Sequence, residues 1–257
     1  MTASERFDLT GKVAIVTGGN GGIGLGMARG LADAGADIAV VGRNEGKCLA
    51  AANELKMRGV KAISIIVDVT DKTAVAEMTR QTLRELGRID ILVNNAGINI
   101  RKPPHVLDID EWDGVIRTNL TSAFLCSQSV YPTMKEMGGG KIINIGSMMS
   151  IFGASFTPAY AASKGGIVQF TRSCACAWAA DNIQTNAILP GWIDTDLTKR
   201  AREQIDGLHE RVLARTPAAR WGVSADFAGI AVFLASHASD FVTGTAIPVD
   251  GGFSIMG

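Results

Sequence analysis

The stretch "KVAIVTGGNGGIGLGMARGLADAG", residues 12–35, decides the fold. It opens with a short β-branched apolar run, passes through a glycine-rich turn and continues with the apolar period of a helix. Glycine permits positive φ and a close approach of backbone to ligand, and a helix start presents free N–H groups to an anion. A strand, glycine turn and helix in this order are typical of a dinucleotide pyrophosphate site, the alternative being a tight turn without ligand. The predicted contacts are Gly18, Asn20, Gly22, Ile23 and Gly24.

Six further strand-like runs follow, separated by longer helical patterns. With residues 12–17 they occupy 36–42, 61–67, 89–97, 140–147, 183–190 and 244–252. The runs are continuously apolar, which is typical of strands buried on both faces. We therefore predict one α/β domain over residues 1–257, a doubly wound, Rossmann-type fold with a seven-stranded parallel sheet flanked by helices. The charged segment 192–220 interrupts the alternation, and we expect it to form an exposed flap that covers the substrate.

Composition narrows the classes of partner. The 257 residues carry 25 basic and 25 acidic side chains, so the net charge indicates neither a nucleic acid nor an anionic membrane surface, and a small molecule is the expected partner. The four cysteines have no CxxC spacing and the three histidines have no metal-ligand spacing. No run of about 18 apolar residues is present. We expect free thiols, no metal, no membrane span and a cytoplasmic location.

Motifs along the whole chain point to one family. The glycine turn has the spacing TGxxxGxG, and it is followed by "NNAG" at 94–97, Asn119 in "RTNLTSAF", Ser147 in "INIGSMMS", "YAASK" at 160–164 and "LPGWIDT" at 189–195. Together, and in this order, these motifs resemble the short-chain dehydrogenase/reductase family. The resemblance implies hydride transfer between a nicotinamide and a carbonyl or alcohol.

The stretch "YAASK" supplies the expected proton-transfer pair. Tyr160 and Lys164 are four positions apart, so on a helix they share one face. Free tyrosine has a pKa of about 10, and a neighbouring ammonium would favour the phenolate. The Ser147 hydroxyl can polarise the substrate oxygen, and the resemblance implies that Asn119 holds a water near Lys164 as a proton relay. Taken singly, each residue also has an ordinary structural interpretation; together they form the predicted catalytic set.

The end of the second strand bears on the coenzyme. Gly42 stands where NAD-specific relatives carry aspartate, and Arg43 follows it. Arginine can bind a phosphate through two parallel N–H bonds, so NADP(H) is favoured. NAD(H) stays open, because the second basic residue that NADP-dependent relatives often carry in the glycine turn is missing here.

The resemblance also implies further coenzyme contacts. Asp68 and Val69 are expected beside the adenine, and Asn95 and Gly97 along the coenzyme, whereas Asn94 is expected to tie adjacent strands. Residues expected at the nicotinamide are Tyr160, Lys164, Pro190, Gly191, Ile193 and Thr195.

The substrate pocket is expected to contain Ile98, Asn99, Arg101, Met148, Met149, Phe152 and Trp192. Arg101 is either a site for an anionic group or a surface charge. The runs "NNAGINIRKP", "GKIINIGSMMSIFG" and "TPAARWG" resemble the branch of gluconate 5-dehydrogenases and 2-deoxy-D-gluconate 3-dehydrogenases, which implies interconversion of a secondary alcohol and a ketone, with a keto sugar acid as candidate substrate. The alternatives are a 3-oxoacyl-[acyl-carrier-protein] reductase and a catalytically silent NADP-binding sensor. Relatives are commonly tetramers, and the apolar faces of 163–180 and of the C-terminal "VDGGFSIMG" are compatible with a homotetramer.

Overall fold

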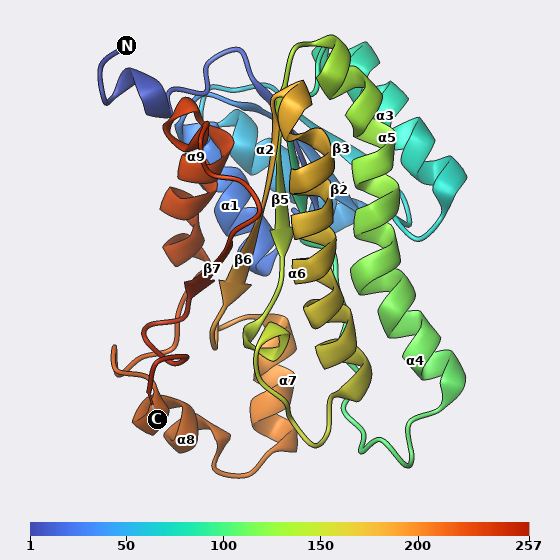
Figure 1. The fold of residues 1–257 in the computed structure, drawn as a ribbon, viewed down its shortest axis with the longest axis vertical. Coiled ribbons are helices and arrows are strands. Elements are labelled where there is room, and N and C mark those ends of the chain that lie inside the picture. Colours follow the sequence, from blue (N-terminus) through green and yellow to red (C-terminus); the bar gives the residue numbers. More distant parts are fainter. Residues whose placement is uncertain (257) are drawn as a thin grey trace.

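The sheet of the protein has seven parallel strands in the order β3-β2-β1-β4-β5-β6-β7 in a computed structural model that describes residues 1–256 (Figure 1). The strands are β1 Val13–Thr17, β2 Asp37–Gly42, β3 Ala62–Ile66, β4 Ile91–Asn94, β5 Gly140–Ile145, β6 Ile183–Pro190 and β7 Ala246–Val249. The strand order reverses on the two sides of β1, which places a topological switch point between β1 and β4. The predicted doubly wound parallel sheet is confirmed.

Helices cover both faces of the sheet. The helices α1 Gly22–Asp33, α2 Glu45–Lys56 and α9 Ala228–Ala235 lie on one face, and α3 Lys72–Leu86, α4 Ile109–Ile116, α5 Ser122–Glu136 and α6 Pro158–Trp178 lie on the other (Figure 1). All five residues of β1 are buried, as expected for a strand between two helical layers. A Cβ at Gly30 of α1 would lie 2.7 Å from Ala228 Cα, so this glycine lets α1 and α9 pack closely.

The largest differences from the predicted strands are at β4 and β7, predicted as 89–97 and 244–252. β4 ends at Asn94 instead of continuing to 97, because the next residue leaves the ladder: Asn95 donates its side-chain amide to Thr17 O and Gly18 O, at 3.0 and 3.1 Å. β7 ends at Val249, and Gly251 and Gly252 then take positive φ values of 65° and 89°. In both places the chain turns away at the carboxyl end of the sheet, where sites of such folds are built.

The predicted flap is more ordered than its charge suggests. It contains α7 Asp196–Gln204 and α8 Leu208–Arg215, which lie at the carboxyl ends of the strands, at the bottom of Figure 1. Its apolar residues form a small core around Trp221, which packs edge-to-face on Trp192 with ring centres 5.6 Å apart. The segment is therefore polar on its outside and anchored by its own hydrophobic cluster.

Within residues 1–256, no helix is both long and apolar enough to cross a membrane, and no group of three or more His, Cys, Asp or Glu side chains could hold a metal ion. The four cysteines are free.

Candidate active site

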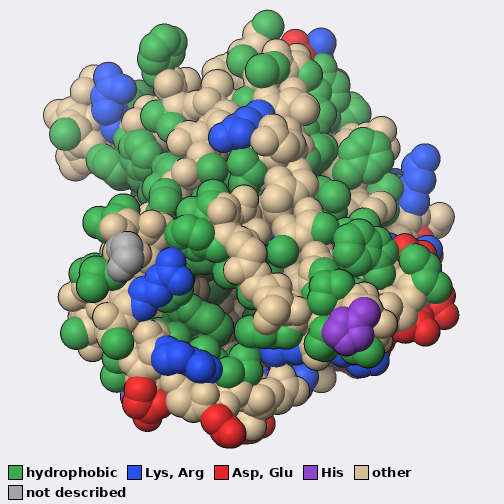
Figure 2. All heavy atoms as spheres, turned by 60° about the horizontal axis from the view of Figure 1, so that its bottom comes forward, with side chains coloured by type: hydrophobic (Ala, Val, Ile, Leu, Met, Phe, Trp, Pro, Cys, Tyr) green, Lys and Arg blue, Asp and Glu red, His purple; other side chains and the backbone are tan. Residues whose placement is uncertain are grey.

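A cavity of about 530 Å³ opens at the carboxyl ends of the strands. Figure 2 looks onto this end of the molecule and shows a hollow with Lys and Arg side chains at its rim. The lining combines the glycine turn, the loop after β4, the end of β5, the start of α6 and the first part of the flap. The cavity thus brings together segments that are far apart in the sequence.

The pair of Tyr160 and Lys164 lies on α6, as predicted. The helix starts at Pro158, whose fixed φ suits a first helical position, so both residues fall within the first two turns. Lys164 is only 4% exposed, and its Nζ donates to Ile145 O at 2.6 Å and lies 5.6 Å from the centre of the Tyr160 ring. Burial lowers the pKa of Lys164 from 10.5 to about 8, which leaves the ammonium mostly protonated at neutral pH.

Burial, a hydroxyl and a positive charge all act on the phenol of Tyr160. Burial raises its pKa above the usual value of 10.0, while the Ser147 hydroxyl and the positive charge of Arg101 act in the opposite direction. The Lys164 ammonium is hydrogen-bonded to the Ile145 carbonyl and lies 5.6 Å from the centre of the phenol ring. Arg101 is a second cation that favours the phenolate, and sequence reasoning connected it only with the substrate.

Ser147 is held at the end of β5 by a short 3₁₀ helix, Met148–Ser150, which it caps. Its Oγ accepts from Met149 N at 3.2 Å, and its own N–H donates to Ser150 Oγ at 3.1 Å. Ser150 Oγ in turn donates to Lys164 O at 2.7 Å. This chain of bonds fixes the serine relative to α6 and leaves its O–H proton available to a ligand.

Asn119 lies in a π-helical turn, Arg117–Thr121, between α4 and α5, a distortion that often marks functional sites. Its side chain is 98% buried and fully engaged on the donor side: Nδ2 donates to Ile98 O at 2.9 Å and to Ser163 Oγ at 3.0 Å, and Oδ1 accepts from Ile98 N at 2.8 Å. Asn119 therefore positions the loop after β4 against α6. Its predicted contact with a relay water stays a prediction.

The glycine turn fits a pyrophosphate. Gly18 has φ 63°, and a Cβ there would lie 2.8 Å from Asn95 Nδ2; a Cβ at Gly24 would overlap the Gly18 carbonyl. A Cβ at Gly21 would meet no other atom. Gly21 is the N-cap of α1, and no side chain caps the start of this helix. The first N–H groups of a helix have no partner within the helix, so they are available to an anion here.

The predicted residues divide into two groups. Those that line the cavity are Asn20, Gly22, Ile23, Asn95, Gly97, Ile98, Asn99, Arg101, Ser147, Met148, Met149, Tyr160, Lys164, Pro190, Gly191, Trp192, Ile193 and Thr195. Those outside the lining are Gly18, Gly24, Arg43, Asp68, Val69, Asn119 and Phe152. Val69 is 93% buried in the core between the sheet and α3, whereas Arg43 and Asp68 are exposed and face each other at 3.9 Å.

Asn94 has the structural role expected of it. It is the register partner of Asn144 on β5, and its Nδ2 donates to Asn144 Oδ1 at 2.8 Å and to Ser127 Oγ at 3.0 Å. Asn144 Nδ2 in turn donates a hydrogen bond to Thr171 Oγ1 on α6, at 2.9 Å. This buried network ties β4 and β5 to the helices beneath the site.

Two contacts at the cavity escaped sequence reasoning. Lys47, in the first turn of α2, lines the cavity and lies 3.5 Å from Asp196 of the flap. Arg101 donates to Gln204 Oε1 at 3.2 Å and to Leu197 O at 3.3 Å, also in the flap. For the first contact, the sequence offered one indication, a lysine four positions after Arg43. The second contact joins residues about a hundred positions apart, and no sequence pattern indicates it.

The model of the short chain dehydrogenase family matches residues 12–206. The chain belongs to the short-chain dehydrogenases. The resemblance inferred from the motifs is thereby confirmed, and with it the assignment to oxidoreductases that act on CH–OH groups.

Similar proteins cover nearly the whole dehydrogenase. A 2-dehydro-3-deoxy-D-gluconate 5-dehydrogenase of Dickeya dadantii is 44% identical over 97% of this chain and 98% of its own length. A gluconate 5-dehydrogenase of Gluconobacter oxydans is 38% identical over 99% of both chains. The crystal structure of a gluconate 5-dehydrogenase from Burkholderia cenocepacia, in complex with NADP and tartrate, superimposes with a TM-score of 0.94 at 40% identity and covers 99% of both chains.

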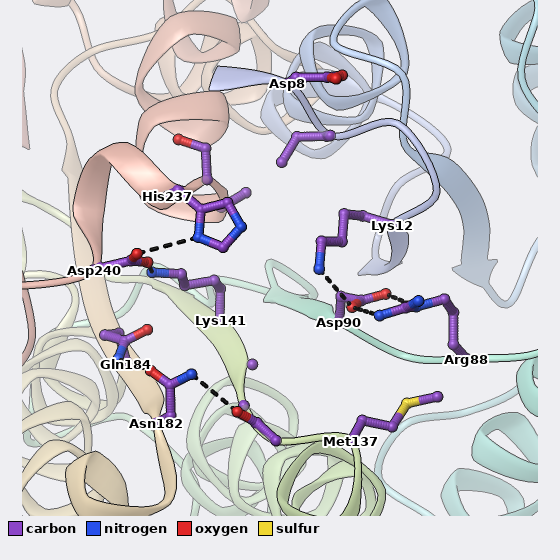
Figure 3. Close-up of a pocket in the computed structure, with 16 residues that line it drawn as sticks. Asp8, Lys12, Arg88, Asp90, Met137, Lys141, Asn182, Gln184, His237 and Asp240 are labelled. Atoms are coloured by element: carbon purple, nitrogen blue, oxygen red, sulfur yellow. Dashed lines mark hydrogen bonds and ion pairs between the residues drawn. The ribbon is translucent and has the colours of Figure 1, made fainter. Parts of the chain in front are cut away.

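A second cavity of this dehydrogenase, about 190 Å³, lies at the amino ends of the strands (Figure 3). Asp90 there accepts two bonds from Arg88, at 2.6 and 2.7 Å, and one from Val13 N at 3.0 Å. Across the cavity, Asp240 pairs with Lys141 at 2.8 Å and with His237 at 3.1 Å. These carboxylates and cations are paired with one another. We therefore assign them the structural role of linking the starts of the strands, and no catalytic role.

Proposed function

We propose that this protein is an NADP(H)-dependent dehydrogenase that interconverts a secondary alcohol of a sugar acid and the corresponding ketone. The observation that carries the proposal is the convergence of Ser147, Tyr160, Lys164 and Arg101 on one cavity whose other end is the glycine turn. Three of these side chains suit proton handling at a hydroxyl, and the fourth suits a carboxylate.

In this proposal the coenzyme supplies or accepts the hydride, and the protein handles the proton. The Ser147 O–H donates to the substrate oxygen, and Tyr160 Oη takes the hydroxyl proton in oxidation or returns it in reduction. Lys164 places a positive charge 5.6 Å from the centre of the Tyr160 ring, and Arg101 also favours the phenolate. Asn119 holds the Ile98 backbone in place and, through a water, would connect Lys164 to solvent.

The substrate class rests on Arg101. Its guanidinium is half-buried, lines the cavity and acts electrostatically on the Tyr160 phenol, so an anionic group bound to it would sit beside the reacting hydroxyl. Arginine binds carboxylates through paired N–H bonds. The relatives named for gluconate derivatives, and the neighbour that holds tartrate, agree with a hydroxylated acid. They also favour this substrate over a 3-oxoacyl-[acyl-carrier-protein].

The coenzyme preference rests on the end of β2. Gly42 offers no carboxylate to a ribose diol, while Arg43 and Lys47 are exposed and only loosely paired with Asp68 and Asp196, at 3.9 and 3.5 Å. Exposed pairs of this kind are weak, so both cations can turn to a 2′-phosphate. The Burkholderia neighbour with NADP agrees with this choice.

The test is initial-rate kinetics with gluconate, 5-keto-D-gluconate, 2-dehydro-3-deoxy-D-gluconate, a cyclic ketone and a 3-oxoacyl thioester, each with NADPH or NADH in the matching direction. We expect turnover of a sugar acid with a preference for NADP(H). Preferred turnover of the thioester would overturn the substrate class. If the protein binds NADPH but none of the compounds oxidises it, the result would instead support a catalytically silent sensor. The structure gives no reason to favour a sensor, because Tyr160 and Lys164 both line the cavity.

We further propose a homotetramer in the cytoplasm, with the flap over the substrate. Phe124 of α5 is 44% exposed and packs on Phe170 of α6, and Ile255 near the C-terminus is exposed, so two separate apolar surfaces suit two kinds of subunit contact. The four free thiols fit a reducing compartment. Sedimentation equilibrium tests the assembly, and a monomer at micromolar concentration would refute it.

A further inference from the structure

The end of β2 holds an interlock of three residues. Gly42 is the last residue of β2, Asn20 lies in the glycine turn and Cys48 lies in the first turn of α2. Asn20 Nδ2 donates to Cys48 Sγ at 3.2 Å. A Cβ at Gly42 would lie 2.6 Å from Asn20 Nδ2 and 3.0 Å from Cys48 Sγ. Carbon atoms pack at about 3.5–4.0 Å, so the pair occupies the space of a side chain at position 42.

The thiol is the fixed part of this interlock. Cys48 is fully buried, and it belongs to the hydrophobic core that α2 forms with the sheet, together with Ala51, Ala52 and Leu55. A Cβ at Gly42 would require this buried Sγ to shift by a few tenths of an ångström. Asn20 can swing on its side-chain torsions, but only by giving up its bond to Cys48. A substituent at Gly42 therefore has to break the Asn20–Cys48 contact.

We propose that Cys48 is a positioning residue for coenzyme selection: its thiol holds the Asn20 amide across Gly42 and thereby keeps the ribose end of the site without a side chain. Selection for NADP(H) then has two parts. The cations Arg43 and Lys47 attract the 2′-phosphate, and the interlock occupies the space at position 42 from which an acidic side chain would bind the ribose diol of NAD(H). This inference rests on the proposed NADP(H) preference and adds the packing that maintains it.

The test is a double-mutant cycle between positions 42 and 48, with kcat/KM for NADPH and NADH measured on one ketone substrate. Gly42→Asp alone should lose NADPH use without gaining NADH use, because its Cβ meets the Asn20 amide and the Cys48 thiol. Gly42→Asp with Cys48→Ala should use NADH about tenfold better than Gly42→Asp alone, a coupling typical of residues in contact. An equal gain of NADH use in the single and the double variant would overturn the proposal.

Conservative substitution separates positioning from simple stability. Cys48→Ser keeps an acceptor for Asn20 and should hold the NADPH to NADH ratio within about twofold, whereas Cys48→Ala should lower it about fivefold through KM. Equal ratios in the two variants would refute the role of the thiol. Thermal unfolding of each variant identifies any variant that fails to fold. If a Gly42→Asp variant fails to fold, the comparison of the NADPH to NADH ratio between Cys48→Ser and Cys48→Ala decides. A wild type without preference for NADPH would contradict the proposed function, while the coupling between 42 and 48 would still test the interlock.

Discussion

Replacing Lys164 by methionine should stabilise the fold while it removes catalysis. Burial costs this ammonium free energy: a pKa lowered from 10.5 to about 8 corresponds to about 3 kcal/mol at neutral pH, since each tenfold change in the acid constant is worth about 1.4 kcal/mol. Methionine fills a similar volume without the charge. The Ile145 carbonyl loses its donor at 2.6 Å, which offsets about 1.5 kcal/mol. We expect a net gain of about 1–2 kcal/mol at pH 7.5.

The pH dependence makes the test sharp. Between pH 8 and pH 10.5 the unfolded chain holds a proton on Lys164 that the folded chain has lost, so the stability of the wild type rises with pH in this window. The methionine variant lacks this rise. Its advantage should therefore shrink by about 2 kcal/mol between pH 7.5 and pH 9.5.

Urea unfolding of the coenzyme-free protein, followed by circular dichroism at several pH values, measures both quantities. Lys61→Met, at an exposed lysine, controls for the loss of one positive charge. An advantage of Lys164→Met that stays constant from pH 7.5 to 9.5 would refute the reasoning, because it would mean that the ammonium is not disfavoured by burial.

Four further outcomes follow from the geometry. Tyr160→Phe should lower kcat about 10³-fold and leave the Kd for NADPH, measured by fluorescence, within several-fold, since only the proton-transfer group is removed. Arg101→Met should raise KM for the sugar acid about tenfold to a hundredfold and that for an uncharged ketone much less, with Arg101→Lys in between. Lys47→Met should raise KM for NADPH about fivefold and leave that for NADH unchanged, and an equal effect on both would contradict a 2′-phosphate contact. Asp90→Ala should lower the free energy of unfolding by about 2 kcal/mol, because Val13 N and Arg88 lose their acceptor, whereas Asp8→Ala at the rim of the same cavity should change it little.

The strands of the sheet were predicted well from the sequence, because a strand that is buried on both faces is a continuous apolar run. The run 183–190 coincides with β6, whose eight residues are all buried. Strand ends were less predictable. The sequence predicted that β4 continues through Asn95 to Gly97, but the Asn95 side chain donates to the Gly18 carbonyl in the glycine turn, 77 positions away. Such bonds are set by the neighbouring strand and leave no local pattern.

The proton-transfer site shows the same division. The spacing of Tyr160 and Lys164 correctly placed both on one helical face, because helical geometry is local. It did not show that Arg101 also acts on the phenol. The positions of the Lys164 ammonium and of the Arg101 guanidinium at the phenol are decided by packing between segments.

Helix α7 joins the two ends of the cavity. Its first residue, Asp196, pairs with Lys47 at the coenzyme end, and its last, Gln204, accepts from Arg101 at the substrate end. Each tie uses a cation that the proposed function assigns to a different anion, a 2′-phosphate or a carboxylate. A ligand that takes up Lys47 releases Asp196 and leaves α7 held by Arg101, which bonds to Gln204 and also to Leu197 O. Variants of Lys47 and Arg101 should therefore change separate Michaelis constants, and their combined effect should be additive unless α7 transmits the loss of one tie to the other.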